Sequence, residues 1–335
     1  MKQLLALGLV LMLLTGCGAP PMQTVRIFAM DTVMELSVCT EQEELPAQAE
    51  ALLHELDHAL SATDPESEIY ALNLRGHGNL SPLTAQLLEQ ALDCAAQTNG
   101  ALALSVYPAM ELWGFPSGEY HIPTEAELSR LRPLVDDGRI RFSPETGAVS
   151  LDEGMKLDLG SVAKGFAGDQ VLSLLAQQGV ASALLNLGGN VQALGTKPDG
   201  SPWRVGIRDP NSTDILGILS LSGGAAITSG GYERWFEGPD GTRYHHILDP
   251  KELRPARSGL VSVTVVGPQG LRCDALSTAL FVMGEAEAIS FWQAHRDFEM
   301  LLVNEAGELL LTPGLESVFE PAPDCPYARR VLDEP

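Results

Sequence analysis

The 335-residue sequence predicts an α+β fold in which helices flank mixed sheets. Segments with helical spacing of apolar residues alternate along the chain with segments that have the two-residue period of a strand. The sequence contains no internal repeat and no low-complexity linker. It is long enough to bury a large core. We therefore expect one compact body with two lobes.

Apolar spacing and end signals predict the helices. Leu53, Leu56 and Leu60 follow the helical period. Thr124 and Glu127 form a capping box, which marks the first turn of another helix. The predicted helices are 46–60, a segment from 81–82 to 99–100, a segment after 124, 161–178, 274–283 and 286–295.

Alternation and short apolar runs predict strands between these helices. A paired glycine followed by Asn190 separates two of them. The predicted strands are 25–38, 148–151, 155–159, 183–187, 191–194, 203–207, 217–221, 244–247, 260–266, 300–303 and 309–311.

The segment 156–165 predicts a phosphate site. A short apolar strand carries Asp158 and ends at Gly160 and Ser161, where a helix holding Lys164 begins. The first N–H groups of such a helix have no partner within it and point at whatever lies in front of them. This arrangement suits a phosphate group.

A second segment predicts a site for a hard cation. Asp274 and Thr278 are four residues apart and therefore share one face of a predicted helix. A carboxylate beside a hydroxyl offers the oxygen ligands that Mg²⁺ prefers. Together the two segments suggest an enzyme that handles a magnesium-bound phosphate compound.

Three glycine-containing segments have two possible interpretations each. Leu112, Trp113 and Gly114 form an aromatic loop that either holds a flat ring or anchors the core. The glycines 188–189 either admit a ligand to the backbone or make a hairpin. The segment 227–232, which contains Ser229, either donates hydrogen bonds to a ligand or forms a tight turn.

His245 and His246 are adjacent in a predicted strand, so their side chains point to opposite faces. One of them can face a site while the other is solvated. Because adjacent strand residues do not converge on one ion, the pair is not a metal site. The unperturbed pKa of histidine makes the one that faces a site a candidate general base.

The N-terminus predicts a secretory signal with lipid attachment. Residues 1–14 carry one charge, on Lys2, and an apolar run too short for a stable membrane span. Small residues then precede Cys17, as in a bacterial lipobox; the alternative is an ordinary signal with an unrelated cysteine. We expect a signal over 1–16, a lipid on Cys17, a tether over 17–24 and an extracytoplasmic protein anchored to a bacterial membrane.

The charge of the chain excludes nucleic acid as a partner. The net charge is −23, and loss of Lys2 with the signal makes it −24. Any phosphate site must therefore contain local positive charge, which a metal ion would supply. The other four cysteines have no CxxC spacing and are expected to be buried thiols, with one disulfide possible in an oxidising compartment.

Taken in order, these segments resemble the ApbE family, the FAD:protein FMN transferases. The resemblance extends over nearly all of 25–335, which we expect to be one transferase domain. The chain departs from the family pattern at Thr63, at Ala103–Leu104, at Asp31 and at Glu252–Leu253. The matching blocks are 30–32, 67–69 with Asn73, 112–115, 158–165, 186–189, 228–230, 246–250 and 274–280.

The resemblance implies transfer of FMN from FAD to a Thr or Ser hydroxyl of an acceptor flavoprotein or redox-complex subunit, with release of AMP. It implies that Mg²⁺ is held by Asp274, Thr278 and the backbone carbonyl of Ser161. The residues that it implies around the FAD are Met30, Leu112, Trp113, Gly114, Asp158, Lys164 and His246. His246 is the expected base, and Asp274 is its rival for that role.

Two other functions are compatible with the same residues. One is a Mg²⁺-dependent FAD pyrophosphatase, which would use water and release FMN and AMP. The other is a lipoprotein that binds FAD without catalysis. Asp274, Thr278 and Lys164 argue against storage, because storage requires no activated phosphate.

Overall fold

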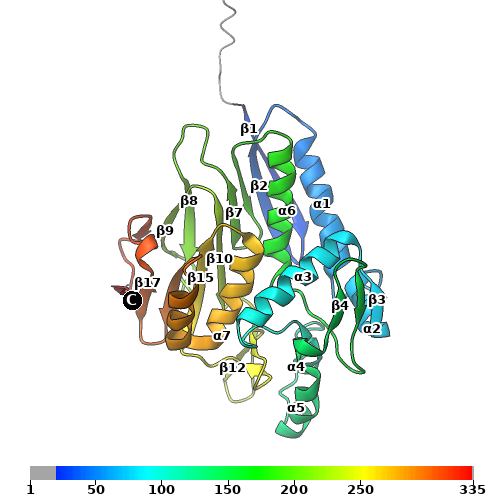
Figure 1. Cartoon of the computed structure of the whole chain (residues 1–335). Helices are drawn as coiled ribbons and strands as arrows, with labels where there is room; N and C mark the ends of the chain where they lie inside the picture. Colours follow the sequence, from blue (N-terminus) through cyan, green and yellow to red (C-terminus); the bar gives the residue numbers. More distant parts are fainter. Residues whose placement is uncertain (1–19, 334–335) are drawn as a thin grey trace, which may run out of the picture.

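A nine-stranded sheet runs through the computed structural model, which describes residues 20–333 (Figure 1). In sheet order the strands are β1 (Met22–Ala29), β2 (Thr32–Cys39), β6 (Ala183–Asn186), β7 (Asn190–Leu194), β10 (Gly224–Gly230), β15 (Leu260–Gly267), β16 (Glu299–Asn304), β17 (Glu308–Leu311) and β19 (Ala328–Val331). Neighbouring strands are antiparallel, except that β17 and β19 are parallel.

Long helices cover one face of this sheet (Figure 1). They are α1 (Leu45–Leu60), α3 (Pro82–Gln97), α6 (Ala163–Gln177) and α7 (Gly270–His295). Helix α6 packs against both α1 and α7. The apolar residues that predicted α1 form its buried face, where Leu53 and Leu56 are almost fully buried. The predicted helices 46–60 and 161–178 are thus confirmed within one or two residues.

Helix α7 contains a break that agrees with the two predicted helices 274–283 and 286–295. Gly284 has a φ of 78° and a ψ of 173°, which are not helical. A side chain at Gly284 would place its Cβ 2.8 Å from the carbonyl oxygen of Ser258. Glycine is therefore required at this position by both conformation and space.

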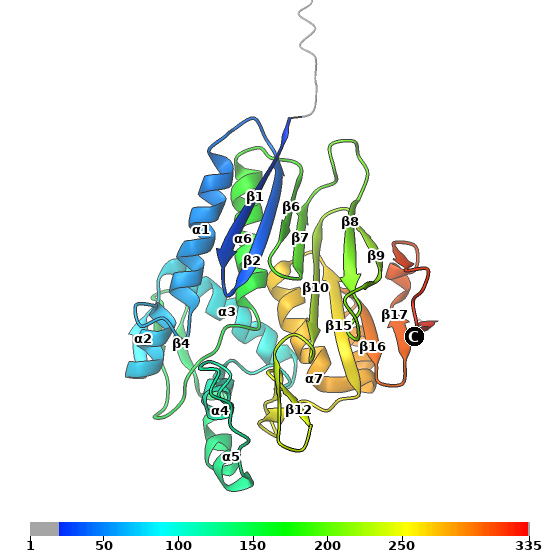
Figure 2. The ribbon, with the colours of Figure 1, turned by 180° about the vertical axis from the view of Figure 1, so that it is seen from behind.

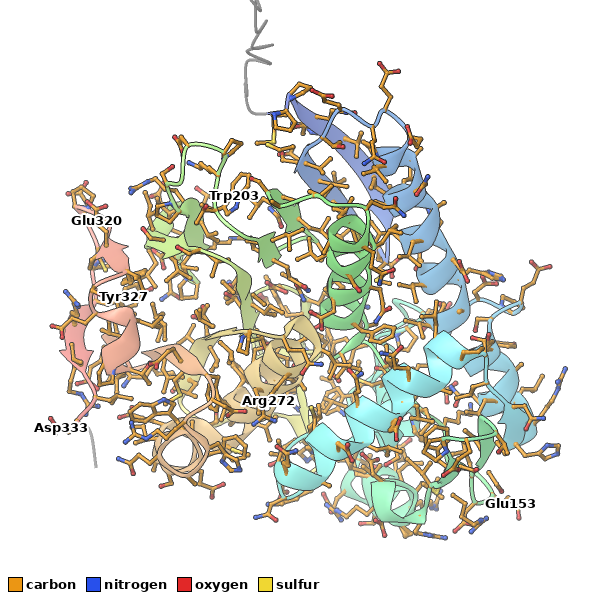
Figure 3. The ribbon with its side chains drawn as sticks, turned by 45° about the horizontal axis from the view of Figure 1, so that its top comes forward. Glu153, Trp203, Arg272, Glu320, Tyr327 and Asp333 are labelled. Atoms are coloured by element: carbon orange, nitrogen blue, oxygen red, sulfur yellow. The ribbon has the colours of Figure 1, made fainter. Side chains whose placement is uncertain are left out.

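A second, smaller sheet covers part of the other face of the large sheet, as Figure 2 shows. It consists of β18 (Phe319–Pro321), β9 (Ile215–Leu221) and β8 (Trp203–Arg208). Trp203, Val205 and Ile207 of β8 alternate with exposed residues and pack on the large sheet. Figure 3 labels Trp203 and also Tyr327, whose hydroxyl donates to Asp209 Oδ1 at 2.6 Å.

A lobe at one end of the molecule contains α4 (Tyr107–Trp113), α5 (Glu125–Leu131) and the hairpin of β11 (Trp235–Glu237) and β12 (Arg243–His245) (Figure 1). Its own apolar core includes Trp113, Phe115 and Phe236. The capping box predicted at Thr124 and Glu127 is present at the start of α5. This lobe forms one wall of the candidate site described below.

The remaining elements are short. Helix α2 (Glu68–Arg75) leads into a small sheet of β3 (His77–Asn79), β5 (Ala148–Ser150) and β4 (Arg141–Ser143). Strands β13 (Leu248–Asp249) and β14 (Arg254–Pro255) pair with each other. The 3₁₀ helices are η1 (Leu104–Val106), η2 (Arg132–Leu134), η3 (Asp137–Arg139) and η4 (Pro313–Leu315).

The single strand predicted over 25–38 is a hairpin of two strands. Ala29 pairs with Thr32, and Met30 and Asp31 make the two-residue turn. Both turn residues have a positive φ, 49° and 58°. Two-residue hairpin turns of this kind are usually signalled by Asn-Gly or Asp-Gly, and neither is present here.

The strand predicted at 155–159 is wrong: this segment is irregular and pairs with no strand of the described chain. The side chain of Asn73 satisfies both backbone groups of Leu157, at 2.8 and 2.6 Å. The Asp158 N–H donates to the Leu104 carbonyl at 2.7 Å. A side chain and a neighbouring turn thus supply the hydrogen bonds that a sheet would have given.

Two segments form regular elements where no helix or strand was predicted. Tyr107–Trp113 forms helix α4, so Leu112 and Trp113 do not lie in a loop. Gly224–Gly230 forms β10, an inner strand, although hydroxyls and glycines usually indicate a turn. In both cases tertiary packing prevails over the local signal.

The α+β class itself is confirmed.

Over residues 20–333, no helix has the length and apolar character needed to cross a membrane. The predicted signal and Cys17 lie outside the described residues. Cys39, Cys94, Cys273 and Cys325 are free thiols, and the first three are buried.

Candidate active site

A cavity of about 490 Å³ lies where the large sheet, the helices and the α4–α5 lobe meet. Its wall includes the β1–β2 turn, the end of α1, the start of α6 and the N-terminal half of α7. Most predicted site residues line it, although they come from distant parts of the sequence: Met30, Asp158, Ser161, Lys164, Ser229, His246, Asp274 and Thr278.

The chain around Asp158 is built to enter the cavity and then start a helix. The Gly160 N–H donates to Asp158 Oδ1 at 2.8 Å, which bends the chain before Ser161. Helix α6 begins two residues later and presents Lys164 to the cavity. Burial raises the pKa of Asp158, while the charges of Arg234 and Lys164 oppose that shift.

Asp274 is held in place by the start of α6. The Gly165 N–H donates to Asp274 Oδ2 at 2.7 Å. The Asp274 residue is only 6% exposed, and burial raises the pKa of its carboxyl to about 6, although the charge of Lys164 opposes the shift. A buried carboxylate with a raised pKa is stabilised by any cation that approaches it.

The oxygen atoms around Asp274 fit a hard cation. Because the Gly165 N–H donates to Asp274, it does not close a helical hydrogen bond to the carbonyl of Ser161, and that carbonyl also belongs to a cavity residue. Thr278, one turn after Asp274, lines the same wall. Carboxylate, hydroxyl and carbonyl oxygens form the donor set that Mg²⁺ accepts.

Ser229 connects β10 to the same helix. Its Oγ lies 2.8 Å from Ser277 Oγ and 3.3 Å from Thr278 Oγ1. The segment 227–232 therefore contributes hydroxyls to the cavity from a strand. Within residues 20–333, no group of three His, Cys, Asp or Glu side chains is arranged to hold a metal ion.

His246 directly follows β12 and faces the cavity. Its Nδ1 lies 3.2 Å from the carbonyl oxygen of Arg234. A carbonyl only accepts hydrogen bonds, so Nδ1 carries the proton and the lone pair is on Nε2. Burial lowers the pKa of His246 to about 3, and the charge of Arg234 adds to that effect. The imidazole is therefore neutral at pH 7.

His245 contacts other protein groups, whereas the strand pattern allowed it to be solvated. Its Nε2 lies 3.0 Å from the Ala256 carbonyl oxygen. Its ring stands edge-on to Phe281 at 5.5 Å between centroids. Burial lowers its pKa. The two neighbouring histidines thus have different partners and different surroundings.

Met30 and Gly188 also line the cavity. Met30 sits in the tight β1–β2 turn with its unusual positive φ. A Cβ on Gly188 would lie 2.3 Å from Thr32 Oγ1, so only glycine lets these two turns approach. Backbone strain of this kind is common where a binding site needs a fixed shape.

The aromatic segment is the exception among the predicted site residues, because Leu112, Trp113 and Gly114 do not line the cavity. The Trp113 ring is fully buried, and its Nε1–H donates to the Leu253 carbonyl at 2.8 Å. Gly114 is the left-handed residue that ends α4. The structural interpretation of this segment holds here, while Met110 and Pro116 on either side of it reach the cavity.

Several cavity residues were not predicted. Asn190, Glu233 and Arg234 all line it. Asn190 directly follows a glycine pair that was noted for close backbone approach, and the two charged residues follow the 227–232 segment. The only sequence signal for these three residues was that each lies next to a segment suspected of binding a ligand.

Comparison with known proteins shows similarity over most of the chain. The ApbE family model matches residues 30–302. An FAD:protein FMN transferase of Klebsiella pneumoniae is 30% identical over 298 residues, which are 87% of this chain and 92% of that protein. One of Treponema pallidum is 36% identical over 254 residues, 70% of this chain and 69% of that protein.

Solved structures give the same result. The ApbE protein of Thermotoga maritima superposes with a TM-score of 0.84 at 29% identity, over 89% of this chain and 99% of that one. The flavin transferase ApbE of Vibrio cholerae gives 0.79 at 26% identity, over 89% and 100%. With the family model covering most of its length, the chain belongs to the ApbE family.

Proposed function

We propose that this protein is a Mg²⁺-dependent FAD:protein FMN transferase. It would move FMN from FAD to a Thr or Ser hydroxyl of an acceptor flavoprotein or redox-complex subunit and release AMP. The observation that carries the proposal is the convergence of Asp274, Lys164 and His246 on one cavity. The names of the Klebsiella pneumoniae and Treponema pallidum relatives support it.

In this reaction the acceptor hydroxyl oxygen forms a bond to the phosphorus of the FMN half. The bond between that phosphorus and the bridging oxygen breaks, and AMP leaves with the bridging oxygen. The hydroxyl proton goes to a base on the protein. Such transfers depend mainly on positioning and on stabilising negative charge.

The cavity residues can perform these tasks. Lys164 places an ammonium group beside the Asp158 and Asp274 carboxylates, and so supplies positive charge for a diphosphate. Asp274, Thr278 and the Ser161 carbonyl would hold Mg²⁺. When bound, Mg²⁺ offsets the negative charge that builds on the phosphate oxygens.

His246 is the proposed base. Its Nδ1–H is committed to the Arg234 carbonyl, so Nε2 remains free to accept the hydroxyl proton. With no anion nearby, its pKa of about 3 makes it a weak base. The negative charge of a diphosphate nearby favours the protonated imidazole and raises that pKa toward the range of an effective base.

Incubation with FAD, MgCl₂ and a recombinant flavin-carrying domain in its flavin-free form tests the proposal. We expect a fluorescent band at the acceptor's position on a denaturing gel and one AMP per flavin attached. The acceptor with its target Thr changed to Ala is the control. Asp274→Ala should abolish transfer, because the metal site loses its carboxylate.

The other outcomes point to the other functions. Free FMN and AMP with no labelled acceptor would indicate a pyrophosphatase. FAD that survives intact with MgCl₂ and acceptor present would indicate a binding protein. Asp274→Ala activity equal to that of the wild type would refute the assigned metal site.

We further propose that the protein is an extracytoplasmic lipoprotein, anchored to a bacterial membrane through a lipid on Cys17. The support is the charge and length of residues 1–16 and the small residues before Cys17. Membrane fractionation tests this proposal: Cys17→Ala should move the protein out of the membrane fraction and abolish labelling by radioactive palmitate. A variant that remains in the membrane fraction would contradict it.

A further inference from the structure

Asn190 has a side-chain donor with nothing to bind. The residue is the first of β7, lines the cavity and is only 3% exposed. Within the described chain, its Nδ2 has no hydrogen-bond partner. A buried amide donor without a partner costs about 1–3 kcal/mol, and such groups are rare in folded proteins. Its retention beside a substrate cavity therefore requires an explanation.

The orientation of the Asn190 amide follows from its neighbour Gln192. Gln192 Nε2 donates to the Gly165 carbonyl at 2.9 Å. A carbonyl only accepts, so the nitrogen of Gln192 must be on that side. The same nitrogen lies 3.1 Å from Asn190 Oδ1. Because two amide nitrogens would repel each other there, the oxygen of Asn190 faces Gln192 and its NH₂ group faces the other way.

Gln192 is itself fixed by the crossing of α6 and α7. Cβ atoms on Gly168 and Gly270 would lie 2.2 and 2.3 Å from its Nε2. Only glycines at these two positions leave room for the Gln192 amide. The chain from the Gly165 carbonyl through Gln192 to Asn190 is therefore rigid, and the direction of the free donor is set in advance of binding.

The surroundings of the donor indicate the ligand. Asn190 lies near the Asp274 carboxylate, whose pKa it helps to lower, but the two groups lack the geometry of a hydrogen bond, so Nδ2 stays available. The charge of Lys164 also acts on Asp274, and all three residues line the same cavity. A group that binds between a lysine and the proposed metal site carries negative charge and accepts hydrogen bonds. A phosphate oxygen has both properties.

We propose that Asn190 is a further substrate-positioning residue, whose Nδ2–H donates to an oxygen of the diphosphate of the flavin dinucleotide. The inference rests on the proposed function, because it takes FAD as the substrate. Asn190 thereby aligns the diphosphate against Lys164 and the oxygen ligands of the metal site, and binding gives Nδ2 the acceptor that it lacks within the described chain.

The test compares FAD with riboflavin, which lacks the ADP part of FAD and with it the diphosphate. FAD contains it, whereas riboflavin has the same ring system and no phosphate. Dissociation constants of both are measured by flavin fluorescence, first in EDTA and then in MgCl₂. In Asn190→Ala we expect FAD to bind about 10–100-fold more weakly in both buffers, since a hydrogen bond to a charged acceptor is lost. Riboflavin binding should stay within about twofold of the wild type.

A second variant and a control separate loss of the donor from a general effect on the β6–β7 turn. Asn190→Asp retains the oxygen that Gln192 needs but replaces the donor with negative charge, so it should bind FAD more weakly still and riboflavin as the wild type does. Asn186→Ala is the matched control: its amide oxygen accepts from Gly189 in the same β6–β7 turn and does not line the cavity. It should bind both flavins normally.

Three outcomes would overturn the inference. If Asn190→Ala bound FAD with the affinity of the wild type, the proposed contact between Asn190 and the diphosphate would be refuted. Equal weakening of FAD and riboflavin would show that Asn190 only maintains the shape of the cavity. Failure of the wild type to bind FAD would remove the proposed function itself, whereas the first two results leave that function standing.

Discussion

The two ring nitrogens of His246 have different environments, and this difference gives a prediction that does not need the acceptor. With Nδ1–H donated to Arg234 and the pKa lowered by burial to about 3, the empty enzyme holds a neutral imidazole throughout pH 5–8. With a pKa of about 3, the ring carries a second proton only in strongly acidic solution, so it does not titrate in this range. Nitrogen NMR should show one ring with Nδ1 protonated and Nε2 unprotonated at every pH between those limits.

His246→Gln identifies this ring, because its two nitrogen signals disappear in the variant. Signals that move with a midpoint near 6.5 would contradict the burial of this imidazole. Signals from the opposite tautomer would contradict its role as a base through Nε2. Either result can be obtained without a transfer assay.

Trp113 tests the difference between a buried anchor and a ligand contact. Trp113→Phe removes the donor of the Leu253 carbonyl and leaves that carbonyl buried without a partner. We expect a loss of roughly 1–3 kcal/mol in the free energy of unfolding, measured with urea. The FAD dissociation constant should stay within about twofold of the wild type, because the indole does not line the cavity. If the variant were folded and of normal stability but bound FAD much more weakly, Trp113 would be a ligand contact after all.

Sequence spacing could predict some of these residues and not others. Asp274 and Thr278 share a face because a helix has a fixed period, so a single helix was enough to place them together. Trp113 could not be placed in this way, since a ring beside a glycine can turn toward either a core or a cavity. Asn190 depended on Gln192 and on the crossing of two helices, which no local pattern describes.

Among the elements, the crossing of α6 and α7 determines the geometry of the site. A Cβ on Gly165 would lie 2.4 Å from the Gly270 carbonyl oxygen and 2.7 Å from Asp274 Cβ. Gly165 also donates the hydrogen bond that holds Asp274. Close contact between these helices therefore brings the carboxylate to the start of α6.

Gly165→Ala should force the two helices apart. We expect it to destabilise the fold by about 1–3 kcal/mol, as overpacking does, and to weaken Mg²⁺-dependent turnover because Asp274 moves. Gly78→Ala is the control, since a Cβ there meets nothing within 4 Å. Thermal unfolding and the transfer assay give the two measurements. If Gly165→Ala had the stability and turnover of Gly78→Ala, the close crossing would be refuted.

Elements with a strong periodic signal were predictable, whereas those that depend on distant partners were not. The buried stripe of α1 and the break at Gly284 were visible in the sequence. The β1–β2 turn was not, because Met30 and Asp31 lack the glycine that usually marks it. Nor was the irregular segment 155–159, whose backbone partners include Asn73 from a part of the chain more than eighty residues away.

On the scale of the whole molecule, a chain of net charge −23 keeps several carboxylates in or near its core. Burial raises the pKa of Asp158, of Asp169 and of Asp274. Each raised pKa means that the folded protein favours the protonated form of that carboxyl group. The empty protein is therefore under electrostatic strain at neutral pH, and a cation at the site relieves part of it.

This strain predicts how stability depends on pH. The carboxyl pKa of Asp274 rises from an ordinary value of 3.8 to about 6 on folding. A raised pKa contributes stability that is fully present below the unfolded value and is lost as pH rises through the folded value. Between pH 4 and pH 7, Asp274 alone should therefore cost the metal-free protein on the order of 3 kcal/mol.

Asp274→Asn isolates this contribution, because its amide oxygen can still accept from Gly165 but cannot titrate. Urea unfolding in EDTA at steps between pH 4.5 and 7.5 should show that the variant gains stability over the wild type as pH rises. Carboxylates such as Asp169 act in both proteins and cancel in the comparison. If the two proteins kept a constant difference across the range, Asp274 would be ionised in the empty cavity at all these pH values, and the attraction of a cation to a strained buried carboxyl would lose its basis.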